Sequence, residues 1–309
     1  MSRAQLQPRL QVGLDNFGDF LPRKRWREFL DVAAAADAAG VDSISVVDHV
    51  VLGGDLSSYP YGPFVGDSET PWLEPLTTLA AIAGRTSRVR LATGILIAPL
   101  RPPALLAKTA ATLDLLSDGR LDLGVGTGWQ AKEYEAVGLD FGERGRLLDD
   151  GLAACQALWG GGPASFSSPR LSFDDAYSHP TPVQEGGVPF WIGGELHPRN
   201  LARLVRCGRG WIPSPTARRS AVAADIERLD AALAEAGRTP SEVRVRVGLP
   251  TARDEQHRPL LEPSLAKLPS LLELGATDIY VSLTQFCPDP AAAPEFFDTL
   301  VAGFRENLN

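Results

Sequence analysis

The stretch GRLDLGVGTGWQAKEYEAVGLDFGERGRLLDDG, residues 119–151, carries the strongest indication of the fold. A short apolar strand over residues 121–125 runs into Gly126 and Gly128, and Trp129 and an acidic helix start follow. A strand that ends in glycines brings backbone amides close to whatever binds there, because no Cβ stands in the way. The pattern predicts a strand–turn–helix unit whose turn either holds a ligand or is an ordinary βα turn.

Two nucleotide-site patterns come close to this stretch. LDLGVGTG is similar to the first motif of methyltransferases that use S-adenosylmethionine, and in part to a dinucleotide fingerprint. The fingerprint needs a third glycine where Trp129 stands, and both patterns need an acidic residue at the end of the next strand, about 20 residues on. The apolar spacing over residues 143–159 predicts a helix there instead, which would carry Asp149 and Asp150. Both patterns are therefore disfavoured.

The rest of the chain repeats the same unit. Short strands are expected at residues 10–14, 43–48, 89–97, 121–125, 189–192, 210–212, 243–247 and 278–283. Helices are expected at residues 24–39, 75–85, 102–116, 143–159, 198–207, 217–236, 264–274 and 294–306, with Glu133 near the start of the fourth. Eight such units predict a (β/α)8 TIM-type barrel, one domain over residues 1–309, with a doubly wound sheet as the alternative.

Two longer segments interrupt the repeat. A loop over residues 49–72 is rich in Gly, Pro and Tyr, and residues 164–182 have no helical period and suggest a small hairpin. We expect such insertions at the C-terminal face of the barrel, where active sites of this fold lie. Residues 59–70 of the loop are predicted to form a mobile lid.

Composition narrows the range of functions. The formal net charge of −8 argues against binding to nucleic acids or anionic membranes. No apolar run approaches the roughly 18 residues of a membrane span, and the N-terminus lacks the apolar core of a signal peptide. The three cysteines and four histidines show no disulfide or metal-ligand spacing, so no metal is expected. These features predict a soluble cytoplasmic protein with reduced thiols; we also expect a homodimer.

Five motifs occur together in a particular order. They are VVDHV (46–50), YPYGP (59–63), PLTTLAAIAGRTSRVRLATGILIAPLRPP (75–103), GRLDLGVGTGW (119–129) with ERGR (143–146), and PFWIGG (189–194). In order and spacing they resemble the luciferase-like flavin and deazaflavin oxidoreductases, and within them the branch that uses coenzyme F420. The resemblance covers residues 10–213, and the last third of the chain matches weakly.

The resemblance implies roles for individual residues. His49 would lie over the cofactor ring as the acid–base group, with Asp48 near the polar edge of the ring; alone, this pair would indicate only a strand-end turn. Histidine suits proton transfer because its pKa lies near working pH. The bond Gly94–Ile95 would be a non-proline cis peptide behind the ring, with Ile97 facing the cofactor.

Further contacts are implied along the cofactor and around the substrate. Thr127, Gly128 and Lys132 would contact the ring and ribityl chain. Gly193, Gly194 and Glu195 would belong to the segment that receives the phosphate, since amides at a helix N-terminus bind phosphate well. The substrate would lie between the ring and an aromatic wall formed by Tyr61, Trp72 and Trp129.

One departure bears on the substrate. The sugar-phosphate dehydrogenase of this family has a catalytic glutamate where Trp129 stands, and its phosphate-binding lysine and arginine have no clear match here. The resemblance therefore implies hydride transfer between F420 and an organic substrate other than a sugar phosphate. An FMN-dependent monooxygenase with a separate reductase is the alternative, and a non-enzymatic cofactor-binding protein is a second.

Overall fold

The computed structural model describes residues 3–18 and 26–308. Eight parallel strands form a closed barrel, and pairing between β3 and β5 completes the ring. The strands of the barrel are β1 (Arg9–Gly13), β2 (Ser43–Val46), β3 (Arg90–Thr93) with β4 (Leu96–Ile97), β5 (Leu121–Gly126), β8 (Phe190–Gly193), β9 (Gly208–Ile212), β10 (Arg244–Gly248) and β13 (Asp278–Ser282). The (β/α)8 barrel predicted from the sequence is therefore confirmed.

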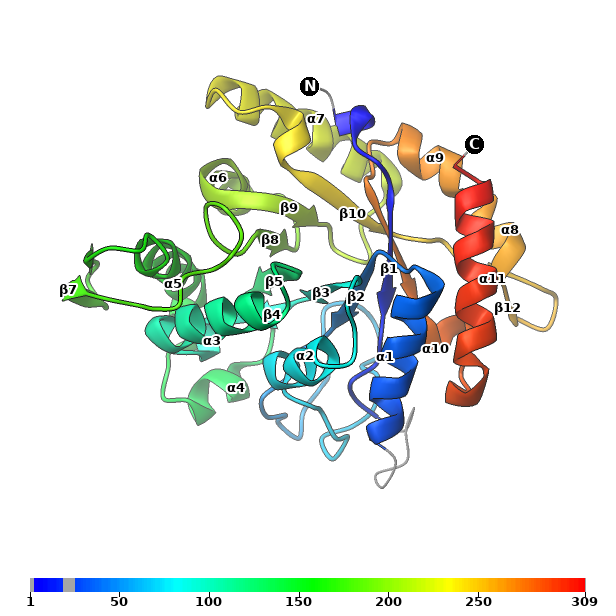
Figure 1. The fold of residues 1–309 in the computed structure, drawn as a ribbon, viewed down its shortest axis with the longest axis horizontal. Helices are drawn as coiled ribbons and strands as arrows, with labels where there is room; N and C mark the ends of the chain where they lie inside the picture. The colour runs from blue at the N-terminus through cyan, green and yellow to red at the C-terminus, as the bar shows by residue number, and fades with distance from the viewer. Residues whose placement is uncertain (1–2, 19–25, 309) are drawn as a thin grey trace.

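Helices surround the barrel, and α1 and α11 lie side by side although they come from opposite ends of the chain (Figure 1). The α-helices are α1 (Arg27–Ala39), α2 (Pro75–Ala83), α3 (Pro103–Leu116), α4 (Ala131–Ala136), α5 (Arg144–Leu158), α6 (Pro198–Cys207), α7 (Arg219–Glu235), α8 (Leu261–Leu265), α9 (Leu268–Glu273), α10 (Leu283–Phe286) and α11 (Ala293–Glu306). Short 3-10 turns lie at Arg3–Gln5, Ala98–Leu100, Phe141–Glu143, Pro240–Glu242 and Pro290–Ala292.

Local sequence explains where several helices begin and end. Pro75, Pro103 and Pro198 stand in first turns, where the missing N–H would have had no partner within the helix. The side chain of Glu74 caps α2. Gly40 ends α1 with a φ of 89°, a left-handed conformation that glycine adopts without a steric penalty.

Some boundaries differ from those expected. The strand expected at residues 89–97 is interrupted between β3 and β4. The helix expected at 264–274 is two helices, with Pro269 in the first turn of α9, where proline ends the preceding helical hydrogen-bond pattern. The helix expected from near Glu133 onward is likewise divided, because Gly138 turns the chain with a φ of 74° between α4 and α5. The expected start of the first helix at residue 24 lies outside the described residues.

Two small hairpins project from the barrel. The expected hairpin is present as β6 (Ala164–Ser167) and β7 (Ser172–Ala176), an antiparallel pair. A second one, β11 (Ala252–Arg253) with β12 (Pro259–Leu260), was not expected from the sequence. Figure 1 shows the β7 hairpin beside α5, at the left edge of the molecule.

The two sides of the barrel wall differ in character. Leu10 and Val12 of β1 belong to an apolar cluster with helix residues such as Phe29. The polar side chains of the strands bind one another: the Nε atom of Arg90 lies 2.6 Å from the carboxylate of Asp122. Because successive side chains of a strand point to opposite faces, the same strands bury an apolar outer layer and carry polar groups on the other face.

Candidate active site at the barrel mouth

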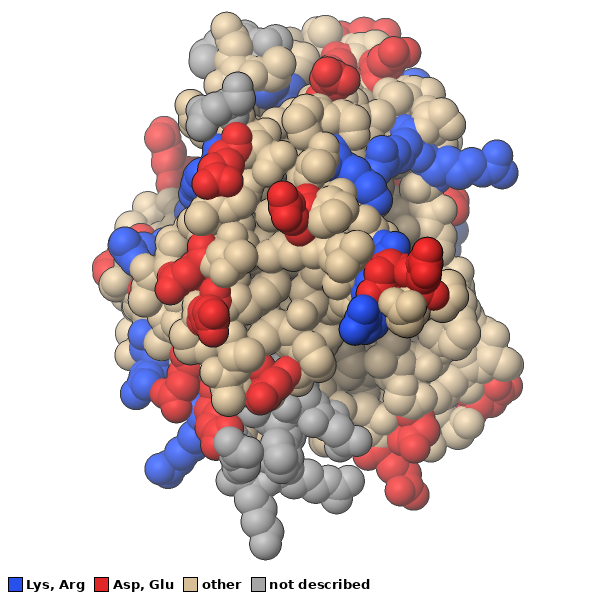
Figure 2. All heavy atoms as spheres, turned by 90° about the vertical axis from the view of Figure 1, so that its right-hand side faces the viewer, with Lys and Arg blue, Asp and Glu red and all other residues tan. Residues whose placement is uncertain are grey.

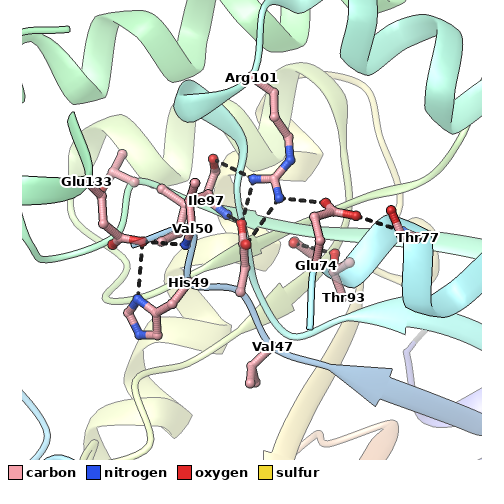
Figure 3. Close-up of polar contacts among 12 residues, drawn as sticks. Val47, His49, Val50, Glu74, Thr77, Thr93, Ile97, Arg101 and Glu133 are labelled. Atoms are coloured by element: carbon pink, nitrogen blue, oxygen red, sulfur yellow. Dashed lines mark hydrogen bonds and ion pairs between the residues drawn. The ribbon is translucent and has the colours of Figure 1, made fainter. Parts of the chain in front are cut away.

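The carboxyl ends of the barrel strands, together with the loop of residues 49–72, form what we call the barrel mouth. His49 follows β2 there, and its side chain is only 9% exposed. Its Nδ1 atom lies 3.3 Å from Oε1 of Glu133, a side chain from α4 that is fully buried. The same Oε1 accepts the N–H of Val50 at 2.9 Å. Figure 3 shows Glu133 between these two partners, so one carboxylate holds both the imidazole and the backbone beside it.

Asp48, the neighbour of His49, has a different set of partners. Its Oδ2 accepts the N–H of Ile97 at 2.8 Å and lies 2.6 Å from Nη1 of Arg101. Arg101 also binds Glu74, at 2.7 Å, and lies between Ile97 and Glu74 in Figure 3. The carboxylate of Asp48 is fully buried. Asp48 therefore ties β2 to the segment after β4, and a contact between Asp48 and a ring edge stays a prediction.

The Gly94–Ile95 peptide bond is cis, as the resemblance implied. The side chain of Ile95 lies against glycines of two neighbouring strands: a Cβ at Gly193 would stand 2.6 Å from Ile95 Cγ2, and one at Gly126 would stand 3.0 Å from Ile95 Cδ1. At Gly128, whose φ is 66°, a Cβ would stand 3.0 Å from Ile97 Cγ2. We call these two closely packed isoleucines the isoleucine floor. Ile97 is only 1% exposed and packs with Leu100 and Tyr134, so its contact with a cofactor stays a prediction.

Aromatic rings surround His49 at the mouth. Trp72 lies 4.7 Å from the imidazole of His49, ring centre to ring centre, and stacks on Phe17 at 4.1 Å. Phe64 of the loop lies 5.6 Å from both His49 and Trp129. The predicted wall residues Trp72 and Trp129 therefore do meet at His49. Their edge-to-face contacts are geometries that aromatic rings favour.

Tyr61 and Glu195 come from opposite sides of the mouth. Tyr61 is 38% exposed and contacts Tyr59 rather than His49, at 5.4 Å between ring centres. Burial, followed by the charge of Glu195, raises the pKa of the Tyr61 hydroxyl. The loop therefore extends from His49 toward the end of β8, across the mouth.

Several buried polar atoms at the mouth make no hydrogen bond. Within residues 3–18 and 26–308 these include Nε1 of Trp72, Nε1 of Trp129, Nε2 of Gln130 and Oε2 of Glu133. Buried donors and acceptors in proteins are nearly always satisfied, so a group of unsatisfied ones indicates a place for a polar ligand or water. A heteroaromatic ring with carbonyl and N–H groups at its edge would fit this chemistry above the isoleucine floor.

A second feature lies beside the mouth, between β5, β8 and α5. We call it the inner hollow; its volume is about 300 Å³. It is lined by Gly126, Thr127, Gly142, Arg144, Gly145, Leu148, Gly193, His197, Arg199, Asn200 and Arg203. Two predicted cofactor residues, Thr127 and Gly193, thus line a hollow that also contains cationic side chains, as an anionic group requires.

The polar groups of the inner hollow are held by one another. Arg203 is almost fully buried, and its guanidinium binds Asp149 at 2.6 Å, Asn200 at 2.7 Å and the carbonyl of Gly145 at 2.7 Å. His197 caps α6, and its Nδ1 accepts the N–H of Asn200 at 3.3 Å. Burial lowers the pKa of His197 below its usual value of 6.5, and the charge of Arg203 adds to this effect.

Two of the predicted cofactor contacts have other partners. Lys132 is 62% exposed and lies 2.5 Å from the carboxylate of Glu135. The N–H of Gly194 donates to the carbonyl of Ile212 at 2.9 Å, so it is not free for a phosphate. From the sequence, Glu133 had no firm role and Arg101 gave no signal of one. An acid at a helix start also suits the helix dipole, and this ambiguity hid the contact of Glu133 with His49.

The fold is a (β/α)8 barrel that carries a buried histidine–carboxylate pair and aromatic rings at the carboxyl ends of its strands. The sequence model described as "Luciferase-like monooxygenase" matches residues 6–297. The chain belongs to this family of oxidoreductases.

Similar proteins include both F420-dependent enzymes and monooxygenases. An uncharacterized protein of Mycobacterium tuberculosis is 32% identical over 267 residues, covering 84% of this chain and 89% of that one. The F420-dependent glucose-6-phosphate dehydrogenase of Nocardia farcinica is 34% identical over 199 residues, covering 60% of this chain and 52% of that protein. The crystal structure of monooxygenase RslO1 from Streptomyces bottropensis superposes with a TM-score of 0.80 at 20% identity, covering 97% and 100% of the two chains.

Membrane spans and metal clusters are both missing from the described part of the chain. None of the helices there combines the length and apolar character that a membrane span requires. Within the same residues, no three His, Cys, Asp or Glu side chains gather as metal ligands would.

Proposed function

We propose that the chain is an oxidoreductase that transfers a hydride between coenzyme F420 and an organic substrate. The observation that carries the proposal is the buried His49–Glu133 pair, which faces an aromatic cover beside an apolar floor. A histidine held by a carboxylate is the arrangement that general acid–base chemistry uses. The similarity to an F420-dependent dehydrogenase is consistent with the deazaflavin, and the similar monooxygenases keep FMN as the alternative.

The residues present fit such a cofactor along its length. The floor of Ile95 and Ile97 would support the ring, and the unsatisfied polar atoms around His49 would meet its polar edge. The inner hollow would receive the phosphate, with Arg144 and His197 as its cationic and hydrogen-bonding side chains. When bound, the deazaflavin supplies the carbon that accepts or donates the hydride.

The protein's own part in the reaction is to move a proton and exclude water. In the oxidation of an alcohol, Nε2 of His49 would accept the O–H proton while the hydride on the carbon that bears the hydroxyl goes to the cofactor, which leaves a carbonyl. Glu133 stabilises the positive charge that His49 then carries, because its carboxylate lies 3.3 Å from Nδ1. The rings of Phe64, Trp72 and Trp129 keep water from the reacting atoms. Reduction of a carbonyl reverses each step.

The substrate would be a partly apolar molecule. Trp129 stands where the sugar-phosphate dehydrogenase has its catalytic glutamate, and aromatic rings border His49. These features favour an alcohol or carbonyl compound with an apolar portion over a sugar phosphate. A homodimer and a cytoplasmic location remain predictions from the sequence.

A substrate screen tests the proposal. Purified protein is incubated with F420 and a panel of alcohols, or with reduced F420 and the matching carbonyl compounds, and the deazaflavin absorbance is followed. We expect the parent protein to turn over at least one of these substrates. The variant His49→Ala should lower this turnover by about 10²–10⁴-fold while its cofactor affinity stays within a few-fold of the parent's. Substrate-dependent oxygen uptake with reduced FMN, and none of the F420 reaction, would instead support the monooxygenase alternative.

A further inference from the structure

A second hollow, which we call the outer hollow, shares one lining residue with the inner hollow. The outer hollow has a volume of about 330 Å³ and is lined by Arg146, Asp149, Asp150, Pro169, Arg170 and Arg199. Arg199 lines both hollows, so the two are neighbours along α5. Gly145 lies directly beneath the Arg199 guanidinium, because a Cβ there would stand 2.8 Å from Nη1 of Arg199.

The β6–β7 hairpin forms one wall of the outer hollow. Its tip is fastened to α5 by Ser168, whose hydroxyl donates to Asp150 at 2.8 Å. Arg170, two residues further on, lies 2.6 Å from the carboxylate of Glu143. Figure 1 shows this hairpin lying beside α5, away from the barrel axis. The insertion therefore presents Arg170 at a fixed place beside the hollow.

The two hollows form a basic region on an acidic protein. Five arginines and three carboxylates lie along them: Arg144, Arg146, Arg170, Arg199 and Arg203, with Glu143, Asp149 and Asp150. The excess is two positive charges, in a chain whose formal net charge is −8. On the opposite side of the molecule, shown in Figure 2, basic and acidic side chains are scattered among uncharged residues.

The carboxylates do not neutralise all of these arginines. Asp149 is shared by Arg199 and Arg203, at 2.7 and 2.6 Å. Glu143 is likewise shared by Arg146 and Arg170, at 2.9 and 2.6 Å. Each guanidinium has five N–H donors. The side chains of Arg146, Arg170 and Arg199 are 66%, 43% and 47% exposed, so donors remain for a ligand with further carboxylates.

We propose that the outer hollow binds a chain of carboxylates that extends the cofactor beyond its phosphate. This inference rests on the proposed function, since F420 carries a lactyl group and glutamate residues beyond its phosphate, whereas FMN ends at the phosphate. The phosphate would occupy the inner hollow and the first carboxylates the outer one. The gain is modest, about two- to fivefold in affinity for each exposed arginine. The region thereby favours the glutamylated deazaflavin over both FMN and shorter deazaflavins.

Binding titrations with a series of cofactor forms test this inference without using activity. Quenching of deazaflavin fluorescence is measured with the ribityl form, the phospholactyl form without glutamate, and the form with several glutamates. We expect the glutamylated form to bind about five- to twentyfold more tightly than the phospholactyl form at low salt. The Arg146→Gln/Arg170→Gln double variant, which keeps Arg199, should remove most of this difference and leave the affinity for the phospholactyl form unchanged. Arg85→Gln, an equally exposed arginine elsewhere, is the control.

The outcomes separate this inference from the proposed function. Equal affinity of the parent for the glutamylated and phospholactyl forms would overturn the tail site and leave F420 binding intact. A double variant that weakens both forms alike would also overturn it, because the two arginines would then act on the phosphate or the fold. No binding of any deazaflavin form would overturn both proposals.

Discussion

The substitution Glu133→Gln tests the pairing on which the proposed chemistry depends. Gln has nearly the shape of Glu, so its oxygen can still accept the N–H of Val50, which now donates to Oε1 at 2.9 Å. The change removes the negative charge 3.3 Å from Nδ1 of His49. It therefore alters the electrostatics of the imidazole while leaving the local backbone held.

The expected loss follows from Coulomb's law. Two unit charges 3.3 Å apart interact by about 5 kcal/mol at an effective dielectric constant of about 20. The dipole of the new side-chain amide retains part of this attraction. We therefore expect the protonated form of His49 to lose roughly 2–3 kcal/mol of stabilisation. That is a fall in kcat of about 10²-fold. The free energy of unfolding should change by less than about 1 kcal/mol, because a buried charge becomes neutral without a change in volume.

The assay is steady-state turnover with the substrate found by screening, together with cofactor titration and urea unfolding. We expect kcat to fall while KM and cofactor affinity stay within a few-fold. Glu135→Gln is the matched control, because it lies on the same helix, is 68% exposed and pairs only with Lys132 among the described residues. An unchanged kcat in Glu133→Gln would refute the reasoning and reduce Glu133 to a support for the backbone at Val50.

Three further predictions concern stability, proton binding and loop motion. Arg101→Ala should lower the free energy of unfolding in urea by about 3–5 kcal/mol, because it leaves the buried carboxylate of Asp48 without its cation. Arg85→Ala, at an exposed ion pair, should lower it by less than about 1 kcal/mol. Equal losses in the two variants would contradict this prediction. Burial lowers the pKa of His197, so it is neutral at pH 7, and an anion in the inner hollow should raise that pKa and cause proton uptake. Calorimetry in buffers of different ionisation enthalpy should detect this proton uptake, and the affinity for the anion should rise as pH falls. The variant His197→Asn keeps the helix cap. Proton uptake that persists in this variant would show that His197 is not the group that binds the proton. The loop of residues 59–70 should exchange its amide hydrogens faster than the barrel strands in ligand-free protein, and protection equal to that of the strands would rule out a lid.

The sequence predicted the barrel well because its signals are local. Short apolar strands, helical spacing and turn residues recur eight times, and no long-range contact is needed to recognise them. The cis bond at Gly94–Ile95 was also predicted correctly, although from the family resemblance rather than from local preference. The division of the helix expected at residues 264–274 was missed because the apolar pattern continues across the break at residues 266–267.

The partners of the site residues could not be predicted in the same way. Val50 and Glu133 are 83 residues apart, and Asp48 and Arg101 are 53 apart, so each contact depends on the closed barrel. Nothing in the local sequence distinguishes a carboxylate that serves the helix dipole from one that reaches a histidine in the loop after another strand. The resemblance pointed to His49 and Asp48 as site residues. Only the fold shows that His49 pairs with Glu133 and that Asp48 pairs with Arg101.

The most direct test of the central claim is a titration of the purified protein with F420 and, separately, with FMN, followed by fluorescence quenching. The account predicts saturable binding of F420 and much weaker binding of FMN, because the isoleucine floor, the His49 region and the two hollows together match the longer, more anionic cofactor. Micromolar binding of FMN with no detectable binding of F420 would contradict it.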